Sequence, residues 1–344
     1  MEMQKRQAIL VIGATGAMGR KVIEHLLQDT DKQWFIRALT RDIHSDRAFA
    51  LTNLSDRIEL FQGNSRNVED LQAATHEVYG IYCNTDMWGL FSPSDFPNEL
   101  SYLEASRDAE IAQGNQILEI AKAANVQHFV YSSLDHMSRL SGGKFSVPHS
   151  DAKAIVQEEI ENKWTLDDWY RHHTTVLQTT SYFENLQSYF APQPRSLDDP
   201  TLVFTLPMAN KPWTMIALDD IGVFARYIFG HPEQTVGTTL AVASQSITMQ
   251  EVVETFTEIT GIQAVYDPFT VDQFRSFGYP GTTDLSNMFE FLQTYGCDRD
   301  FDWLRKIHPH LTSFKEWLHR TRWKGEPIAV QKSIEDQSKT NSMT

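Results

Sequence analysis

The chain has 344 residues, of which 41% are hydrophobic and 22% are charged, a composition that excludes a disordered chain and fits one large or two modest globular domains. Its formal net charge of −15 disfavours direct binding to nucleic acids or to anionic membranes. The only cysteines, Cys83 and Cys297, are too few for a disulfide framework or a cysteine-rich metal site, so no metal is expected. The N-terminal apolar run ends at Gly13, too early for a signal-peptide core or a membrane span, and we expect a cytoplasmic protein.

The first predicted strand covers residues 9–12 and leads into a turn with regularly spaced glycines, followed by an amphipathic helical pattern. This order predicts the strand, turn and first helix of a dinucleotide-binding βαβ unit. Gly13 permits the tight turn, Gly16 lets the backbone approach a pyrophosphate, and Gly19 lets the helix pack on the strand. The helix N-terminus then offers N–H groups to the phosphates.

The second predicted strand, residues 34–39, ends in Thr40-Arg41-Asp42. In dinucleotide-binding folds this strand end reads the adenosine ribose. An acidic residue there binds the 2′-hydroxyl of NAD, whereas an arginine accommodates the 2′-phosphate of NADP. Because Arg41 comes first, the sequence favours NADP and makes NAD the less favoured cofactor. The alternative is that Arg41 is only a solvated loop charge.

Polar residues also follow the third and fourth predicted strands, residues 58–61 and 79–84. Asn64 lies after the third strand, where the fold faces the adenine, although a simple turn would also explain it. Thr85 and Asp86 follow the fourth strand, and we expect them near the pyrophosphate and the nicotinamide ribose.

Strands and helices continue to alternate up to about residue 191, which predicts an α/β fold with a Rossmann-type doubly wound parallel sheet. Beyond that point the alternation weakens, and short strands and helices predict a smaller C-terminal α+β domain. The sequence thus divides into a Rossmann domain (1–191), a smaller substrate or partner domain packed on the cleft (192–323) and a loose polar tail (324–344).

A helix predicted to begin near residue 149 carries the candidate chemistry. Short-chain reductases place a serine hydroxyl and a Tyr-x-x-x-Lys pair at the substrate carbonyl. Here Ser133 stands at the end of the fifth predicted strand, and the pair reads His149-x-x-x-Lys153. Residues four apart share one helix face, so both side chains can point into the same cleft. His149 can act as an acid near neutral pH, or it can simply be a polar residue of the first helical turn. Lys153, Ser133 and His149 are therefore the catalytic candidates.

Over roughly residues 7 to 320 the sequence resembles the NmrA-like family of atypical short-chain dehydrogenase/reductases, and within it the NADP-binding redox-sensor branch called HSCARG-like. The motifs that carry the likeness are Gly13-Ala14-Thr15-Gly16-Ala17-Met18-Gly19, Thr40-Arg41-Asp42, Val130-Tyr131-Ser132-Ser133, His149-x-x-x-Lys153 and Ser181-Tyr182-Phe183-Glu184-Asn185-Leu186.

The resemblance implies where a cofactor binds. Residues 13–18 would wrap the pyrophosphate, Arg41 would hold the 2′-phosphate and Lys153 would bind the nicotinamide ribose. The other implied contacts are Asn64 and Ser65 at the adenine, Thr85, Asp86 and Met87 beside the cofactor, and Tyr182, Phe183, Glu184 and Asn185 over the nicotinamide end. This chain departs from the family at Asp86, where an asparagine is common, and at Met87, where a bulkier aromatic residue is common.

Two functions remain open at this point. The first is an NADP(H)-binding sensor that responds to the NADPH/NADP ratio by changing its shape, a protein partner or a homodimer. The second is an NADPH-dependent reductase of a small carbonyl or quinone compound that uses Lys153, with Ser133 as a further polar group. The missing tyrosine favours the sensor, although relatives resembling isoflavone reductases use a helix lysine without it.

Overall fold

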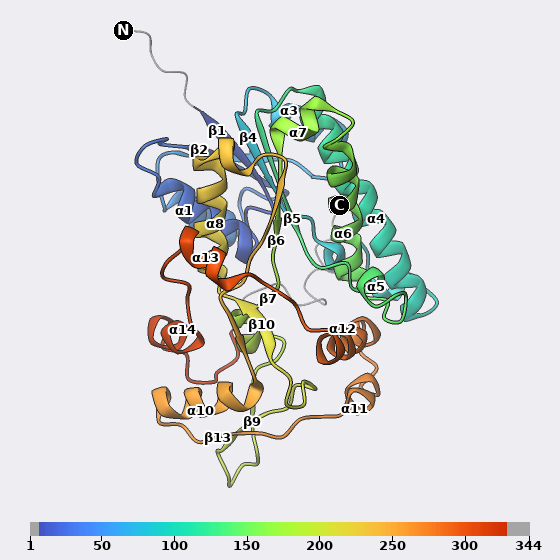
Figure 1. The fold of residues 1–344 in the computed structure, drawn as a ribbon, viewed down its shortest axis with the longest axis vertical. Helices are drawn as coiled ribbons and strands as arrows, with labels where there is room; N and C mark the ends of the chain where they lie inside the picture. The colour runs from blue at the N-terminus through green and yellow to red at the C-terminus, as the bar shows by residue number, and fades with distance from the viewer. Residues whose placement is uncertain (1–6, 329–344) are drawn as a thin grey trace.

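Seven parallel strands form the central sheet of the computed structural model, which describes residues 7–328 (Figure 1). Their bounds are Ala8–Ile12 (β1), Phe35–Thr40 (β2), Ile58–Gln62 (β3), Gly80–Cys83 (β4), His128–Ser133 (β5), Thr174–Gln178 (β6) and Thr238–Ala241 (β11). The order across the sheet is β11-β6-β5-β4-β1-β2-β3, and every neighbouring pair is parallel. The predicted Rossmann-type doubly wound sheet is confirmed.

The central strand β1 explains why both faces of the sheet are covered. It reads Ala-Ile-Leu-Val-Ile, and successive side chains point to opposite faces. Ile9 and Val11 join one hydrophobic cluster, whereas Leu10 and Ile12 join another. Helices α1 (Ala17–Leu27) and α8 (Leu218–Gly230) cover the first face, and α3 (Val68–Thr75), α4 (Glu99–Ala123) and α6 (Pro148–Lys163) cover the second (Figure 1).

Helix α4 begins at Glu99, directly after a capping residue. The side chain of Asn98 accepts a hydrogen bond from the backbone nitrogen of Ser101, and this N-cap fixes the first turn. The other helices of the larger part are α2 (Asp46–Thr52), α5 (Met137–Leu140), α7 (Asp168–His173) and α9 (Pro232–Thr235), with 3₁₀ turns η1 (Met87–Gly89) and η2 (Pro93–Asp95). A third 3₁₀ turn, η3 (Phe183–Gln187), packs into the core of the smaller part.

The smaller part of the molecule contains two three-stranded sheets and a second hydrophobic core. The first sheet has the order β12-β10-β7, with β12 at Gln245–Ile247, β10 at Trp213–Ile216 and β7 at Ser181–Tyr182. The second sheet has the order β13-β9-β8, with β13 at Ala264–Tyr266, β9 at Leu202–Phe204 and β8 at Gln193–Pro194. The helices around them are α10 (Met249–Thr260), α11 (Val271–Arg275), α12 (Thr282–Thr294), α13 (Phe301–Ile307) and α14 (Phe314–Thr321). The smaller α+β part expected from the sequence is therefore present.

The chain crosses between the two parts more than once. We predicted a division after residue 191, and α8 and β11, which lie beyond it in the sequence, pack on the larger sheet. Of the predicted polar tail, residues 324–328 are described, and the backbone nitrogen of Ile328 donates to the carbonyl oxygen of Gln187. Residues 329–344 lie outside the described part of the chain.

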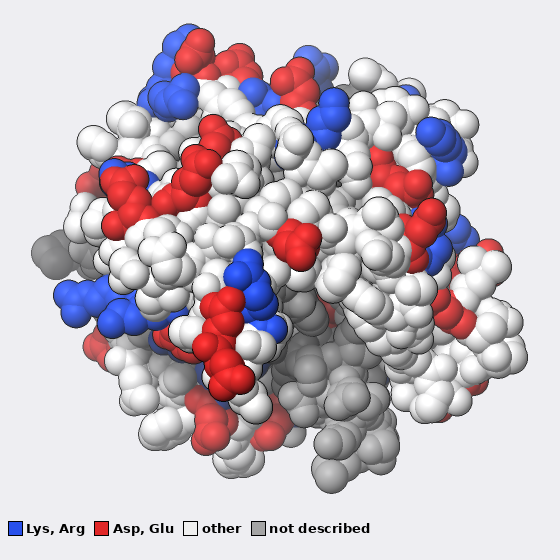
Figure 2. Space-filling model, turned by 90° about the horizontal axis from the view of Figure 1, so that it is seen from below, with Lys and Arg blue, Asp and Glu red and all other residues white. Residues whose placement is uncertain are grey.

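The surface carries both signs of charge. Figure 2 shows acidic and basic side chains interspersed over the face seen from below, with uncharged areas between them. Within residues 7–328, no helix is long and apolar enough to cross a membrane.

Candidate functional site

A cleft of about 490 Å³ opens at the carboxyl ends of β1 and β4, where the order of the strands reverses. Ligands of doubly wound sheets bind at this topological switch point. The sequence-predicted residues that line the cleft are Gly13, Thr15, Gly16, Ala17, Met18, Arg41, Asn64, Ser65, Thr85, Asp86, Met87, His149, Lys153, Tyr182 and Asn185. The fold thus gathers most of the predicted site residues into one place.

Ala14 and Ser133 do not line the cleft. Ala14 is fully buried in the core beneath the turn. All six residues of β5 are buried, and the hydroxyl of Ser133 donates to the carbonyl oxygen of Leu134 at 3.3 Å. Leu134 and Asp135, just beyond the strand, reach the cleft instead. The prediction of Ser133 as a catalytic residue finds no support in its position, because a buried hydroxyl cannot meet a substrate.

Phe183 and Glu184 also lie away from the cleft. Both of them contact Trp317 on α14, in the smaller part of the molecule. The ring of Phe183 packs against Trp317 with 5.9 Å between ring centroids. Glu184 accepts hydrogen bonds from the indole nitrogen of Trp317 (2.9 Å) and from the backbone nitrogen of Leu218 (3.2 Å). Loss of water around the carboxylate raises the pKa of Glu184. These two residues therefore hold α14 and α8 in place.

The turn between β1 and α1 has no room for side chains at two of its glycines. Gly13 has a φ of +83°, and a Cβ there would lie 2.9 Å from the carbonyl oxygen of Asn84. A Cβ on Gly19 would lie 2.2 Å from the carbonyl oxygen of Gly13. The turn and the helix are therefore in close contact, and the N-terminus of α1, with Gly16 as its N-cap, faces the cleft.

Basic side chains gather at one end of the cleft. Arg41, Arg47 and Arg66 all line it, from the segments that follow β2 and β3. Sequence reasoning found Arg41 and missed Arg47, which lies in the first turn of α2. A signal was available, because Ser45 followed by Asp46 is a helix start immediately after β2, and Ser45 does cap that helix.

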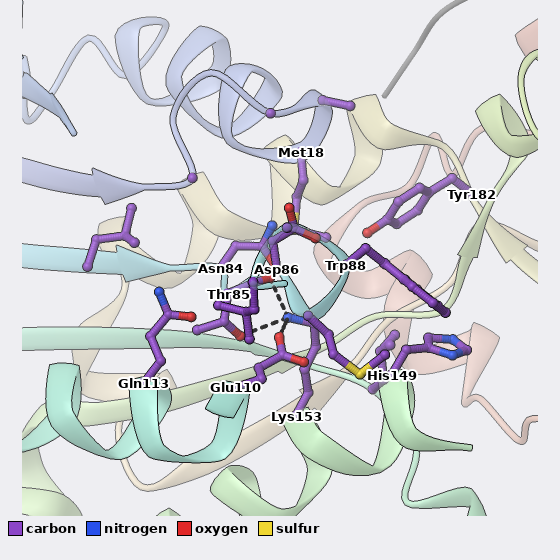
Figure 3. A pocket seen from close by; sticks show the side chains of 18 of the residues that line it. Met18, Asn84, Thr85, Asp86, Trp88, Glu110, Gln113, His149, Lys153 and Tyr182 are labelled. Carbon is purple, nitrogen blue, oxygen red and sulfur yellow. Dashed lines mark hydrogen bonds and ion pairs between the residues drawn. The ribbon is translucent and has the colours of Figure 1, made fainter. Parts of the chain in front are cut away.

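Lys153 is held at the centre of the cleft by three oxygen acceptors (Figure 3). Its ammonium donates to the carbonyl oxygen of Thr85 at 2.6 Å and to the hydroxyl of Thr85 at 2.9 Å. It also lies 2.8 Å from Oε1 of Glu110, a residue that is fully buried on α4. No sequence pattern singles out Glu110, since it lies within a long helix whose buried face depends on the tertiary packing.

His149 joins the two parts of the molecule. Its Nδ1 is hydrogen-bonded to Oδ2 of Asp284, a fully buried residue in the first turn of α12. The other oxygen of Asp284 accepts the backbone N–H of His149 at 3.1 Å. Burial lowers the pKa of His149, but the charge and the hydrogen bond of Asp284 outweigh this effect, so the pKa is raised. The ring of Trp88 lies 5.8 Å from that of His149.

Asp86 adds a negative charge beside Lys153. Its side chain is exposed to the open cleft. The surrounding walls and the nearby Glu110 raise the pKa of Asp86, against the opposing charges of Lys153 and Arg41. Because Glu110 is paired with Lys153 and Asp284 with His149, Asp86 is the carboxyl group that faces the open cleft here.

The end of the cleft farthest from the arginines is apolar and aromatic. It is built from both parts of the molecule, and the side chains there include Trp88, Tyr182, Tyr189, Phe190, Tyr279, Leu285, Met288 and Leu292. Within residues 7–328, no group of three or more His, Cys, Asp or Glu side chains could hold a metal ion. A planar, apolar organic molecule is the ligand that such walls suit.

Comparisons with known proteins extend this picture. The sequence profile of the NmrA-like family matches residues 5–318. FrzB of Cladobotryum sp, named as an NmrA-like family domain-containing oxidoreductase, is 26% identical over 298 residues, which make up 84% of this chain and 84% of FrzB.

Solved structures with the same fold include proteins of different roles. NmrA, a negative transcriptional regulator solved in complex with NAD, has a TM-score of 0.66 at 17% identity, over 99% of each chain. The NADPH-dependent quinone oxidoreductase QOR2 of Escherichia coli, solved with NADPH, has a TM-score of 0.65 at 21% identity, over 92% of this chain and 100% of QOR2.

Proposed function

The chain belongs to the NmrA-like family, as its motifs predicted, and we propose that it binds a nicotinamide dinucleotide and uses it to reduce a small, neutral carbonyl or quinone compound. The observation that carries this proposal is one continuous cleft with three distinct regions. It runs from the basic end at Arg41, past the glycine turn and Lys153, to the aromatic wall at Tyr182. A relative named as an oxidoreductase and a neighbour that acts on quinones support the same reading.

The residues present fit a dinucleotide. The turn at Gly13 packs closely against the end of β4, where a Cβ would clash with the carbonyl oxygen of Asn84, and the N-terminus of α1 offers backbone N–H groups to a pyrophosphate. Arg41 and Arg47 would hold a 2′-phosphate, so we propose NADP(H) in preference to NAD(H). Asn64 and Ser65 would meet the adenine, and Lys153 would meet the nicotinamide ribose. When bound in its reduced form, such a cofactor supplies a hydride.

The chain's own side chains set the environment for that chemistry. Lys153 places a fixed positive charge at the centre of the cleft, and Glu110 and Thr85 hold it there. The aromatic wall excludes water from the space beyond. Because Asp86 lies exposed in the same region, an anionic substrate would be repelled. A neutral acceptor with an apolar body therefore fits best.

The test is NADPH consumption across a panel of neutral aromatic aldehydes and quinones, with matched carboxylated aromatic aldehydes as charge controls. We expect turnover of neutral acceptors and little turnover of the anionic ones. Gly16→Val, which puts a side chain where the pyrophosphate would lie, should abolish both NADPH binding and turnover while the fold persists. Faster turnover of the carboxylated compounds would contradict the proposed substrate class, and no turnover at all would contradict the enzyme.

The second candidate function is the sensor of the NADPH/NADP ratio, and one observation favours it. Helix α12 is tied across the cleft at two neighbouring residues: Asp284 pairs with His149, and Thr283 donates its backbone N–H and its hydroxyl to Glu99 on α4. A ligand bound between these contacts would change the position of α12. Limited proteolysis of residues 192–344 with NADPH or NADP tests this candidate, since a sensor should give different cleavage with the two forms. A protein partner, a homodimer and a cytoplasmic location stay predictions.

A further inference from the structure

One helix turn of α6 carries two groups that the cleft brings together, His149 and Lys153. The tyrosine that short-chain reductases place four residues before the lysine is absent, and His149 occupies its position. A reductase still has to deliver a proton to the oxygen that its hydride leaves negative. The following inference rests on the proposed reductase function and asks which group delivers that proton.

We propose that His149 is the proton donor of the reaction and that Asp284, from the other part of the molecule, is the residue that positions it. Asp284 contacts His149 through both of its oxygens: one meets Nδ1 of the ring and the other accepts the backbone N–H. A carboxylate on one ring nitrogen fixes the orientation of the imidazole and leaves the other nitrogen to act on a substrate. The site is then complete only when α12 is docked on α6.

The remaining ring nitrogen is available for that role. Nε2 of His149 has no hydrogen-bond partner in the described chain, residues 7–328, and His149 lines the cleft. Trp88 lies beside the ring and keeps it at the edge of the apolar end (Figure 3). A carbonyl compound seated against these walls would therefore meet Nε2 rather than Nδ1.

The charged groups around the ring favour its doubly protonated form. Asp284 faces it from α12, Asp151 from α6 and Glu110 from α4, and all of these carboxyl groups raise its pKa. Lys153 lies one turn along the same helix, and its positive charge is paired with Glu110. Asp284 also lies at the N-terminus of α6, where a negative charge is stabilised by the unpaired N–H groups of the first turn.

For an aldehyde substrate, a bound reduced dinucleotide would supply a hydride to the carbonyl carbon, and the electron pair of the C=O π bond would move to the oxygen. That oxygen takes the proton from Nε2, the N–H bond breaks with its electron pair left on nitrogen, and the product is the alcohol. The ring of His149 is then neutral, retains its proton on Nδ1 toward Asp284 and regains the Nε2 proton from solvent.

Three tyrosine hydroxyls in the cleft, those of Tyr182, Tyr189 and Tyr279, compete with His149 as donors. Burial raises the pKa of Tyr182 well above its usual range, with further effects from Glu184 and Asp86, and raises that of Tyr189 and of Tyr279 to about 12. Each of these hydroxyls is therefore a weaker acid than an ordinary tyrosine. The doubly protonated ring of His149 gives up a proton far more readily near neutral pH.

The first experiment needs neither cofactor nor substrate. The titration of the His149 ring is followed by NMR in the full chain, with His149→Gln used to assign its signal. In Asp284→Asn we expect its pKa to fall by about one to three pH units. Glu99→Gln is the matched control, because it weakens the neighbouring contact of Thr283 on α12 with residue 99 on α4 and leaves Asp284 unchanged. An unchanged His149 titration in Asp284→Asn, or an equal fall in Glu99→Gln, would overturn the positioning role.

The second experiment uses the pH dependence of kcat at saturating NADPH, with 2-naphthaldehyde or the fastest aldehyde of the panel. The rate should fall as the pH rises through the pKa of His149, which gives the pH profile of kcat a basic limb. Asp284→Asn should move this limb to lower pH. His149→Gln should reduce kcat about 10²- to 10⁴-fold and remove the limb while NADPH affinity is kept. Tyr182→Phe should leave the limb where it is.

If NADPH binding and turnover persist in His149→Gln with the limb intact, the proton donor is a different group and the reductase stands. If the wild type turns over no acceptor, both proposals fail together.

Discussion

The ammonium of Lys153 lies 2.8 Å from a carboxylate oxygen of Glu110, and Glu110 is fully buried. The second oxygen of Glu110, Oε2, is buried without a hydrogen-bond partner. Lys153 is thus the main group that offsets the free-energy cost of burying the negative charge of Glu110. This arrangement makes Lys153 a structural residue as well as a candidate functional one.

We therefore expect Lys153→Met to lower the free energy of unfolding by about 3–5 kcal/mol, because it leaves the charge of Glu110 buried and unpaired. The double variant Lys153→Met, Glu110→Gln should recover most of that loss, since the charge is gone. Urea unfolding of the two single variants, the double variant and the wild type gives the coupling energy directly. Additive effects would show that the pair does not interact. Activity lost in Lys153→Met can be attributed to chemistry only after this comparison.

The glycine turn gives a second prediction with an internal control. Gly13→Ala forces a Cβ to 2.9 Å from the carbonyl oxygen of Asn84 at a φ of +83°, so the turn must move. Gly142 also has a positive φ, +63°, but nothing lies within 4 Å of a Cβ there. Gly142→Ala should cost about 1–2 kcal/mol for its backbone conformation alone. Gly13→Ala should cost more and should abolish NADPH binding, as measured by thermal unfolding and calorimetry. Equal effects of the two substitutions would mean that the turn is not as tight as its geometry indicates.

Sequence reasoning succeeded where the determinants are local. The apolar run of β1, the glycines after it and the alternation of strands and helices identified the fold, and the family prediction is confirmed. The HSCARG-like branch within that family stays a prediction. Cys83 lies in the core, where burial raises the pKa of its thiol to about 12.

The parts that could not be predicted depend on contacts between distant segments. The His149–Asp284 pair joins residues 135 positions apart, and no pattern near either residue indicates the other. Asp220 shows the same effect. It lies in the first turn of α8, where its side chain is buried and accepts hydrogen bonds from the distant Ser244 and Thr312. Local spacing places a polar residue on a helix, but tertiary packing decides what it binds.

Cofactor preference gives a third prediction, at the basic end of the cleft. Arg41→Ala and Arg47→Ala should each weaken NADPH binding about 10- to 100-fold, the effect of losing a charged hydrogen bond of roughly 1.5–3 kcal/mol. NADH lacks the 2′-phosphate, so its affinity should hardly change. Arg20→Ala, which removes an arginine from the outer face of α1, is the control for net charge. Titration calorimetry with both cofactors measures these effects, and equal affinities of the wild type for NADPH and NADH would rule out the proposed preference.

The last prediction concerns acid stability and the packing of α1 on α8. Asp219 at the start of α8 lies 3.2 Å from Nε2 of His25 and 3.3 Å from Nζ of Lys21, both on α1, and 2.8 Å from Arg320 on α14. The hydrogen bond from His25 and the charges of His25 and Lys21 lower the pKa of Asp219 well below its usual range.

A carboxylate whose pKa is lower in the folded state stabilises the fold fully above its unfolded pKa of about 3.9 and loses that contribution as the pH falls toward the folded value. Asp219→Asn should therefore lower the free energy of unfolding by about 1–2 kcal/mol at neutral pH, since the amide can still accept one hydrogen bond. The difference from the wild type should shrink as the pH falls below about 4, because the carboxylate of the unfolded wild type becomes protonated there while that of the folded protein stays ionised, and this favours unfolding of the wild type. Asp302→Asn is the control, since this carboxylate is 95% exposed and its contact with Arg305 is long, at 3.4 Å. Urea unfolding over a series of pH values measures both variants, and a difference for Asp219→Asn that stays constant into the acid range would show that its contribution is not that of a charged carboxylate.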